Sequence, residues 1–170
     1  MNGLQHGRVR LARAHKAWAT HYQTEKARIV AALAGGQLRI DHVGSTSVPG
    51  LHAKPIVDIS LVVSRDNDIF PAVTALTNAG YEYRGDKADA GGHLLIWAQD
   101  SIVYSHVHLV AQSDPQWRGY LLFRDKLRKD PALRRRYAEL KAALAARFPT
   151  DRPAYTDGKA TFIRSVLHAS

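Results

Sequence analysis

The chain has 170 residues, of which 45% are apolar and 23% charged, and it contains no cysteine. This length suits one hydrophobic core, so we expect a single domain over residues 1–170. The lack of cysteine excludes disulfides, thiolate zinc sites and thiol nucleophiles, so any transition metal would depend on histidine and carboxylate ligands. No apolar run could span a bilayer and the first residues lack the apolar part of a signal peptide, so we expect a soluble, cytoplasmic protein without a membrane partner.

The net charge of +9 is unevenly distributed along the chain. Residues 1–30 carry +5 and residues 114–147 carry +6, whereas residues 31–113 between them carry −3. Basic flanks around an acidic centre can attract a polyanion such as a nucleotide or a coenzyme. The same pattern is equally typical of solvated helix faces. Nucleic acid is the minor interpretation, because the sequence shows neither a recognition helix nor an aromatic stacking platform.

Apolar residues at helical spacing predict a first helix over residues 9–34, which we expect to end at Gly35-Gly36. Leu38–Val43 then predicts a short strand. This strand runs into Gly44-Ser45-Thr46-Ser47, four small residues that suit a tight turn and the start of a helical turn.

The strongest strand candidate is Pro55–Val63, because it is rich in β-branched residues and carries a single charge, Asp58. A helix is predicted over Asp68–Asn78. Three further strands are predicted at Tyr81–Arg84, Gly92–Ala98 and Ile102–Ala111. Their short spacing indicates antiparallel pairing.

The pattern becomes helical from Pro115 onwards, and a last helix is predicted from about Ala154 to His168. The order of helix, strands and helices predicts an α+β fold, with a mixed, largely antiparallel sheet of about five strands and helices packed around it.

The chemistry is predicted where the small-residue turn and the charged strand meet. Twelve residues separate Ser45 from Asp58. Backbone N–H groups in such a turn can bind the phosphates of a nucleotide, while the strand carboxylate reaches a divalent metal that bridges them. Lys54 lies between the two and is a candidate phosphate contact. The segment is not a P-loop, because Gly50 is followed by Leu51 and His52 rather than by lysine and a hydroxyl residue.

The stretch DHVGSTSVPGLHAKPIVDISLVV, residues 41–63, closely resembles the signature of GrpB proteins, a branch of the polymerase-beta-type nucleotidyltransferase superfamily. The spacing of Trp18, Tyr22, Glu25 and Ile29 is similar to the family's leading helix, and SHVHLV, FRDKLRKDP and YTDGKATFI are similar to its later segments. The resemblance implies a nucleotidyltransferase-like fold, a divalent metal such as magnesium, and a nucleoside triphosphate as a possible substrate.

One position departs from that superfamily pattern. Catalytic members carry two acids on this strand and a third on a later strand, which together hold two magnesium ions. Here the second position is Ser60. Strand alternation places Asp58 and Ser60 on one face, which should face the pocket, and Ile59 and Leu61 on the other.

Two histidines in a later strand could compensate for the missing acid. Alternation places Tyr104, His106, His108 and Val110 on one face, opposite Val103, Ser105, Val107 and Leu109. If this strand neighbours the Asp58 strand, the two histidines and Asp58 form a metal site that suits Zn, Mn, Fe or Ni better than Mg. Hydrogen-bonded structural histidines are the alternative.

The leading hypothesis is therefore a metal-dependent, nucleotidyltransferase-like enzyme that acts on a nucleotide or another phosphorylated small molecule. Asp58 and Ser45 would carry the chemistry. The expected phosphate contacts are Gly44, Ser45, Thr46, Ser47, Lys54, Arg124 and Lys159, and the expected metal ligands are Asp58, His106 and His108. For Arg124 and Lys159 the alternative is a surface ion pair.

Two other functions stay open at this stage. The fold could serve as a non-catalytic ligand-binding module, which the serine at position 60 favours. It could also be a histidine- and aspartate-based metal enzyme that acts on a substrate other than a nucleotide. The sequence defines neither the substrate nor the oligomeric state.

Overall fold

The structure is a computed structural model that describes residues 3–13, 16–34, 39–88 and 92–168. A six-stranded mixed sheet forms its centre, with strand order β2-β3-β6-β5-β4 and with β1 paired to the start of β6. The strands are β1 (Leu4–Gln5), β2 (Arg39–Val43), β3 (Val57–Val63), β4 (Glu82–Asp86), β5 (His93–Gln99) and β6 (Ile102–Ala111). Among these strands β3 and β6 pair in parallel, and the other pairs are antiparallel. The predicted α+β class with a mixed, largely antiparallel sheet is confirmed.

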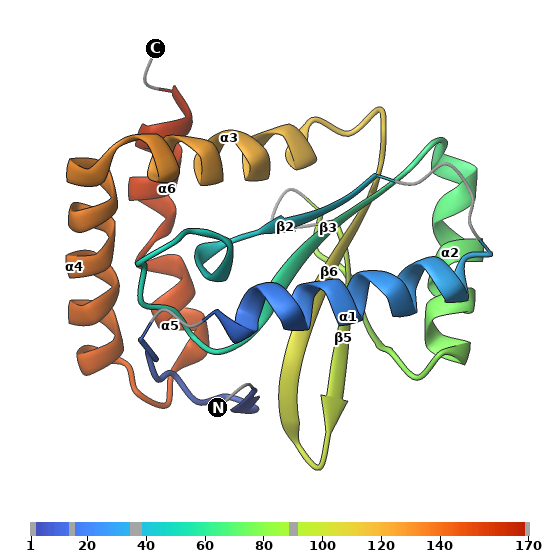
Figure 1. Cartoon of the computed structure of the whole chain (residues 1–170), viewed down its shortest axis with the longest axis horizontal. Coiled ribbons are helices and arrows are strands. Elements are labelled where there is room, and N and C mark those ends of the chain that lie inside the picture. The colour runs from blue at the N-terminus through green and yellow to red at the C-terminus, as the bar shows by residue number, and fades with distance from the viewer. Residues whose placement is uncertain (1–2, 14–15, 35–38, 89–91, 169–170) are drawn as a thin grey trace.

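Helices pack around this sheet. They are α1 (Ala17–Ala32), η1 (Ser45–Ser47), η2 (Asp66–Asp68), α2 (Ile69–Asn78), α3 (Gln116–Lys129), α4 (Pro131–Arg147), α5 (Arg152–Asp157) and α6 (Ala160–His168). Figure 1 shows α3 to α6 grouped at one end of the molecule and α2 at the opposite end. Within the described residues, no helix is long and apolar enough to cross a membrane.

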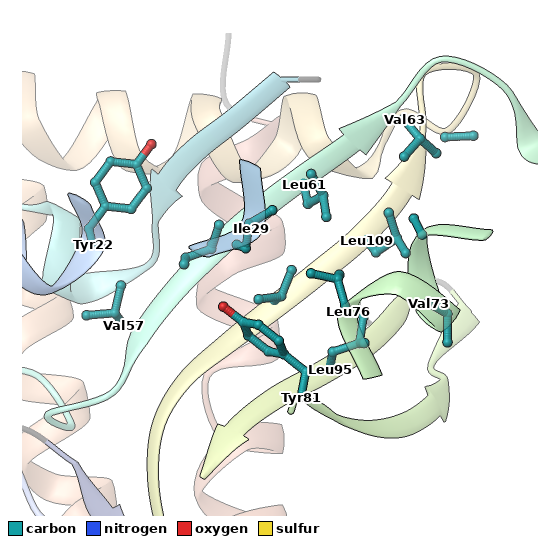
Figure 2. Close-up of a cluster of buried hydrophobic side chains, with 14 of the residues drawn as sticks. Tyr22, Ile29, Val57, Leu61, Val63, Val73, Leu76, Tyr81, Leu95 and Leu109 are labelled. Carbon is teal, nitrogen blue, oxygen red and sulfur yellow. The ribbon is translucent and has the colours of Figure 1, made fainter. Parts of the chain in front are cut away.

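The main core lies between α1, α2 and one face of the sheet (Figure 2). The alternation of β3 and β6 directs the apolar side chains of both strands to this face, where they are buried: Ile59, Leu61, Val107 and Leu109. Ile29 of α1 and Leu76 of α2 are fully buried against them. The opposite face is left to polar residues near the middle of β3 and β6.

A second apolar cluster joins α3, α4 and α6 to the loop after η1. Leu127 of α3 and Tyr137 of α4 are buried there with Val48 and Leu51. This cluster fixes the basic helices beside the turn that begins at Gly44, and therefore beside the polar face of the sheet.

The predicted start of the first helix is wrong. The helix begins at Ala17 rather than near residue 9, because Ala12 exchanges both backbone hydrogen bonds with Ala53 in an antiparallel bridge. The expected stop at Gly35-Gly36 lies outside the described residues.

The single predicted last helix is also wrong, because it is divided into α5 and α6. Gly158 lies at this break, and a Cβ atom at this glycine would come within 2.5 Å of the Leu144 side chain. The close approach of α4 is one reason for a glycine here.

A third difference concerns Val103. A bulge in the β5–β6 pairing shifts the register between Trp97 and Ala98, so Val103 packs with Ile56 and Ile96 on the same face as His106 instead of the opposite face. A bulge inserts one residue and reverses the alternation beyond it.

Candidate functional site

The parallel pairing of β3 with β6 places Asp58 beside His106 and Ser60 beside His108. Asp58 Oδ1 lies 2.9 Å from His106 Nδ1 and 3.7 Å from His108 Nε2. One potential ligand atom from each of these three residues lies within 4.8 Å of the others. The structure thus brings together the carboxylate and the two imidazoles that the sequence suggested as metal ligands.

The turn after β2 abuts this carboxylate directly. Val43 is aligned with Asp58 in the sheet, and Gly44 has a φ of 66°. A Cβ atom at Gly44 would lie 2.5 Å from Asp58 Oδ2, closer than real Cβ contacts allow. Only glycine meets both demands, a positive φ and the absence of a side chain. The turn and the acid, distant in sequence, therefore share one site.

Asp58 is charged at neutral pH and accessible. Burial alone would raise the pKa of its carboxyl group, but the hydrogen bonds from His106 and His108 outweigh burial and hold the pKa well below its usual value. Its side chain is 30% exposed. An ionised, partly exposed carboxylate is a suitable ligand for a cation.

The two histidines are not equivalent. Arg152 Nη2 lies 2.9 Å from His106 Nε2. Because arginine can only donate, Nε2 must accept, and the ring proton of neutral His106 lies on Nδ1, from which it is donated to Asp58. Burial lowers the pKa of His106 to about 4, which keeps the ring neutral. In this tautomer His106 orients Asp58 and offers no lone pair, so Asp58 and His108 are the better ligand pair.

Two buried atoms next to this pair fit a bound cation. Ser60 Oγ and His108 Nδ1 are buried, and neither has a hydrogen-bond partner among the described residues. A buried polar atom without a partner costs about 1–3 kcal/mol. A histidine that binds a metal through Nε2 usually donates its Nδ1–H to a carboxylate, a backbone carbonyl or a water molecule, so a water at Nδ1 would suit His108 as a ligand.

The hydroxyl groups of the turn are used unequally. Ser47 Oγ donates to the Gly44 carbonyl at 2.6 Å, and Thr46 Oγ1 lies 3.0 Å from His42 Nε2. These two side chains hold the shape of the turn and are buried. Ser45 Oγ instead accepts from Lys141 Nζ at 3.1 Å. Of the three predicted hydroxyl contacts, Ser45 is the one directed toward a cation.

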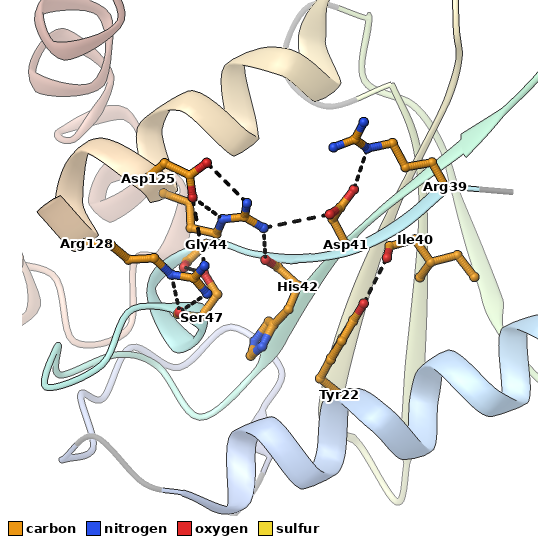
Figure 3. A network of polar contacts seen from close by, with 10 residues as sticks. Tyr22, Arg39, Ile40, Asp41, His42, Gly44, Ser47, Asp125 and Arg128 are labelled. Carbon is orange, nitrogen blue, oxygen red and sulfur yellow. Dashed lines mark hydrogen bonds and ion pairs between the residues drawn. The ribbon is translucent and has the colours of Figure 1, made fainter.

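Two arginines of α3 donate hydrogen bonds to the backbone of this turn and of β2, as Figure 3 shows. Arg128 donates twice to the Ser47 carbonyl, at 2.6 and 3.1 Å. Arg124 donates to the His42 carbonyl at 3.1 Å and to both carboxylate oxygens of Asp125. Arg124, expected to reach a phosphate, therefore positions β2. The physical reason is the neighbouring Asp125, which engages its guanidinium.

The predicted lysines lie beside Tyr155 of α5. Lys54 Nζ and Lys159 Nζ lie 5.6 and 4.5 Å from the centroid of the buried Tyr155 ring. Both side chains are half-buried. Burial, followed by the charges of nearby cations, lowers the pKa of Lys54 to about 7 and that of Lys159 to about 8.

Sequence reasoning missed two cations of the site, Lys141 and Arg152. Lys141 is only 1% exposed, and it donates to the His52 carbonyl as well as to Ser45. Its position was a usable signal, since Lys141 lies on the apolar stripe of a helix between Tyr137 and Leu144. Arg152 had no such signal, because its contact with His106 depends on how α5 packs against the sheet.

Comparison with known proteins places this geometry in a family. The crystal structure of GrpB from Enterococcus faecalis superposes on this structure with a TM-score of 0.83. The two chains are 30% identical, and the match covers 93% of this chain and 94% of that one. A UPF0157 protein of Pseudomonas aeruginosa is 41% identical over 94% of this chain, which spans 66% of that relative's length. The glutamate-rich protein GrpB of Alkalihalophilus pseudofirmus is 29% identical over 99% of both chains.

More distant likeness extends to the fold alone. The poly(U) polymerase Cid1, solved with MgATP, has a TM-score of 0.54 at 11% identity, over 76% of this chain and 45% of that one. The fold is therefore nucleotidyltransferase-like. The family model described as GrpB protein matches residues 8–169, and the chain belongs to the GrpB family.

Proposed function

We propose that the protein is a metal-dependent, nucleotidyltransferase-like enzyme that acts on a nucleotide or another phosphorylated small molecule. The observation that carries the proposal is the contact between Gly44 and Asp58, which joins a small-residue turn to an ionised carboxylate. Transfer of a phosphoryl-type group depends mainly on positioning and on charge neutralisation. A nucleotidyltransferase-like fold supports this type of chemistry.

Each residue has a distinct role in this proposal. Asp58 and His108 bind a divalent cation, and His106, held by Arg152, orients Asp58. The bound cation would neutralise phosphate charge. Ser45 would contact a phosphate oxygen from the turn, where Lys141 donates to its hydroxyl. A mixed imidazole and carboxylate set favours Mn or Zn over Mg.

Replacement of Asp58 by asparagine tests the proposal. Asp58→Asn should reduce the affinity for ATP or GTP in the presence of Mn²⁺ by roughly tenfold to a hundredfold, because a charged metal ligand is lost. Titration calorimetry measures this loss. Asp100→Asn removes the same charge from the exposed β5–β6 turn and should bind like the wild type. A folded Asp58→Asn protein with full metal-assisted affinity would refute the proposal.

Metal analysis of untagged protein tests the ligand set separately. His108→Ala should lower the bound metal more than His106→Gln, since His106 is held in the tautomer that donates to Asp58. Unchanged metal content in both variants would eliminate the histidine-containing site.

A non-catalytic binding module is the second candidate, and Ser60 favours it. Ser60 occupies the position where a second acid is expected, so ligands for a second metal ion are missing on β3. Turnover of nucleotides by the pure protein separates the two candidates. A third candidate, a metal enzyme with a substrate other than a nucleotide, predicts bound metal without any affinity for nucleotides.

A further inference from the structure

Four cationic side chains converge beside the turn and Asp58. They come from four separate segments, and we refer to them as the cationic cluster: Lys54, Lys141, Arg152 and Lys159. Lys54 and Lys159 both lie over the ring of Tyr155. The other two bridge to the site described above: Lys141 reaches Ser45 Oγ, and Arg152 reaches His106.

The four positive charges of the cluster are not balanced by neighbouring carboxylates. Within the described residues, none of the four cations forms an ion pair with an acidic side chain, whereas the exposed arginines Arg39, Arg65 and Arg84 all do. Asp58 is the one carboxylate that acts on all four, and its Oδ1 accepts from His106. Partly buried like charges without counter-ions repel one another and lose hydration. An anion bound among them relieves both costs.

The surroundings favour a large and multiply charged anion. Three ammonium groups and one guanidinium provide many donors but no acceptor, which matches phosphate oxygens. The cluster also has two separate ends, since Lys141 contacts Ser45 in the turn and Arg152 contacts His106 on β6. Two ends of this kind can contact more than one phosphate group.

We propose that the cationic cluster binds a di- or triphosphate chain directly, without a metal ion as intermediary. This inference rests on the proposed function, because it assumes that the ligand is phosphorylated. Superfamily enzymes with several acids neutralise phosphate charge with metal ions. Here Ser60 removes one acid, and the amines supply the positive charge instead. The metal at Asp58 and His108 then adds to an affinity for the phosphate chain that the cationic cluster already provides without it.

Calorimetric titration with inorganic tripolyphosphate in excess EDTA tests the inference. The wild type should bind under these conditions. Lys54→Met and Lys159→Met should each weaken binding about tenfold or more, since each removes a charged donor. Lys129→Met removes the same charge from an exposed position of α3 and should change the affinity less than twofold. Thermal unfolding of each variant establishes that it is folded.

Asp58→Asn distinguishes the inference from the proposed function by the direction in which the affinity for tripolyphosphate changes. It should leave metal-free binding of tripolyphosphate unchanged or make it tighter, because it removes the one carboxylate that, within the described residues, acts on all four cations. The same variant should lose metal-assisted nucleotide binding if the proposed function is right, so the two ideas are tested independently.

Three results would overturn the inference. The first is binding that requires Mn²⁺ or Mg²⁺, which leaves the proposed function intact. The second is equal loss in Lys129→Met, which indicates only general attraction to a basic protein. The third is no binding with or without metal, which contradicts both proposals.

Discussion

Two carboxylates on opposite faces of the same sheet are treated very differently. Glu25 lies on the α1 side, is 1% exposed, and accepts from Tyr81 and Ser105 at 2.9 Å each. Arg28 completes its surroundings at 3.1 Å. Asp58 lies on the other face, is 30% exposed, and has one short contact, from His106. Beside it, two buried polar atoms have no partner among the described residues.

The contrast separates a structural acid from a functional one. Glu25 is buried, accepts two hydrogen bonds and pairs with Arg28, so it has no open side to offer a ligand. Asp58 keeps an open side, so its charge stays accessible to a ligand. The exposed fraction of the side chain, 30% for Asp58 against 1% for Glu25, singles out Asp58 as the acid that can still reach a ligand.

The largest expected effect comes from removing the structural acid. Glu25→Ala should lower the free energy of unfolding by about 3 kcal/mol, because it leaves Tyr81, Ser105 and Arg28 without their common acceptor. Glu25→Gln, which keeps one acceptor oxygen, should lose less than half as much. Urea denaturation measures both. A loss below about 1 kcal/mol for Glu25→Ala would remove the distinction drawn above.

A smaller effect on the free energy of unfolding is expected from a change of pH. It arises from the cations on the side of the sheet that carries Asp58. Burial lowers the pKa of Lys141 to about 7, from an ordinary value of 10.5. Between these values the unfolded chain binds more protons than the folded one, so stability rises with pH from about 7 towards 10.5. Each such amine contributes up to about 1.4 kcal/mol per pH unit.

Lys141→Met should therefore show a smaller rise in the free energy of unfolding between pH 7.5 and 8.5 than the wild type does. The histidines do not interfere in this interval. Burial lowers the pKa of both His42 and His106 to about 4. Their contribution to the free energy of unfolding therefore rises between about pH 4 and 6.5 and no longer changes above about pH 7. Equal slopes in the two proteins would show that Lys141 stays charged in the fold.

The sequence predicted the elements of the site better than their connections. The strand that carries Asp58, the turn at Gly44 and the alternation of His106 and His108 all follow from local patterns, and the parallel β3–β6 pairing brings them together. The five predicted strands agree with the structure to within two residues, whereas β1 was not predicted. Periodicity and turn chemistry depend on neighbours in the chain, which a single sequence contains.

The missed features depend on contacts between distant segments. Arg152 determines the tautomer of His106, and Asp125 engages Arg124, yet neither pairing follows from residue type or spacing. The first helix starts late because Ala12 pairs with Ala53, forty-one positions away. Such pairings are decided by packing, and local propensity cannot rank them.

The smallest effect on stability is expected at the functional acid. Asp58→Asn should change the free energy of unfolding by less than about 1 kcal/mol at pH 8, because asparagine keeps the acceptor for His106 Nδ1 and fills the same space beside Gly44. The loss of its attraction for the cationic cluster is limited, since the lowered pKa values of Lys54 and Lys141 allow these amines to release protons at that pH.

Glu25→Gln is the matched comparison, because both variants replace a carboxylate with its amide. Denaturation of the two proteins under the same conditions measures how much each charge contributes to the fold alone. If Asp58→Asn loses as much as Glu25→Gln, Asp58 is a structural acid and the incomplete hydrogen bonding around it does not indicate a ligand site. If Asp58→Asn loses clearly less free energy of unfolding while metal-assisted nucleotide binding disappears, the charge of Asp58 serves binding rather than the stability of the fold.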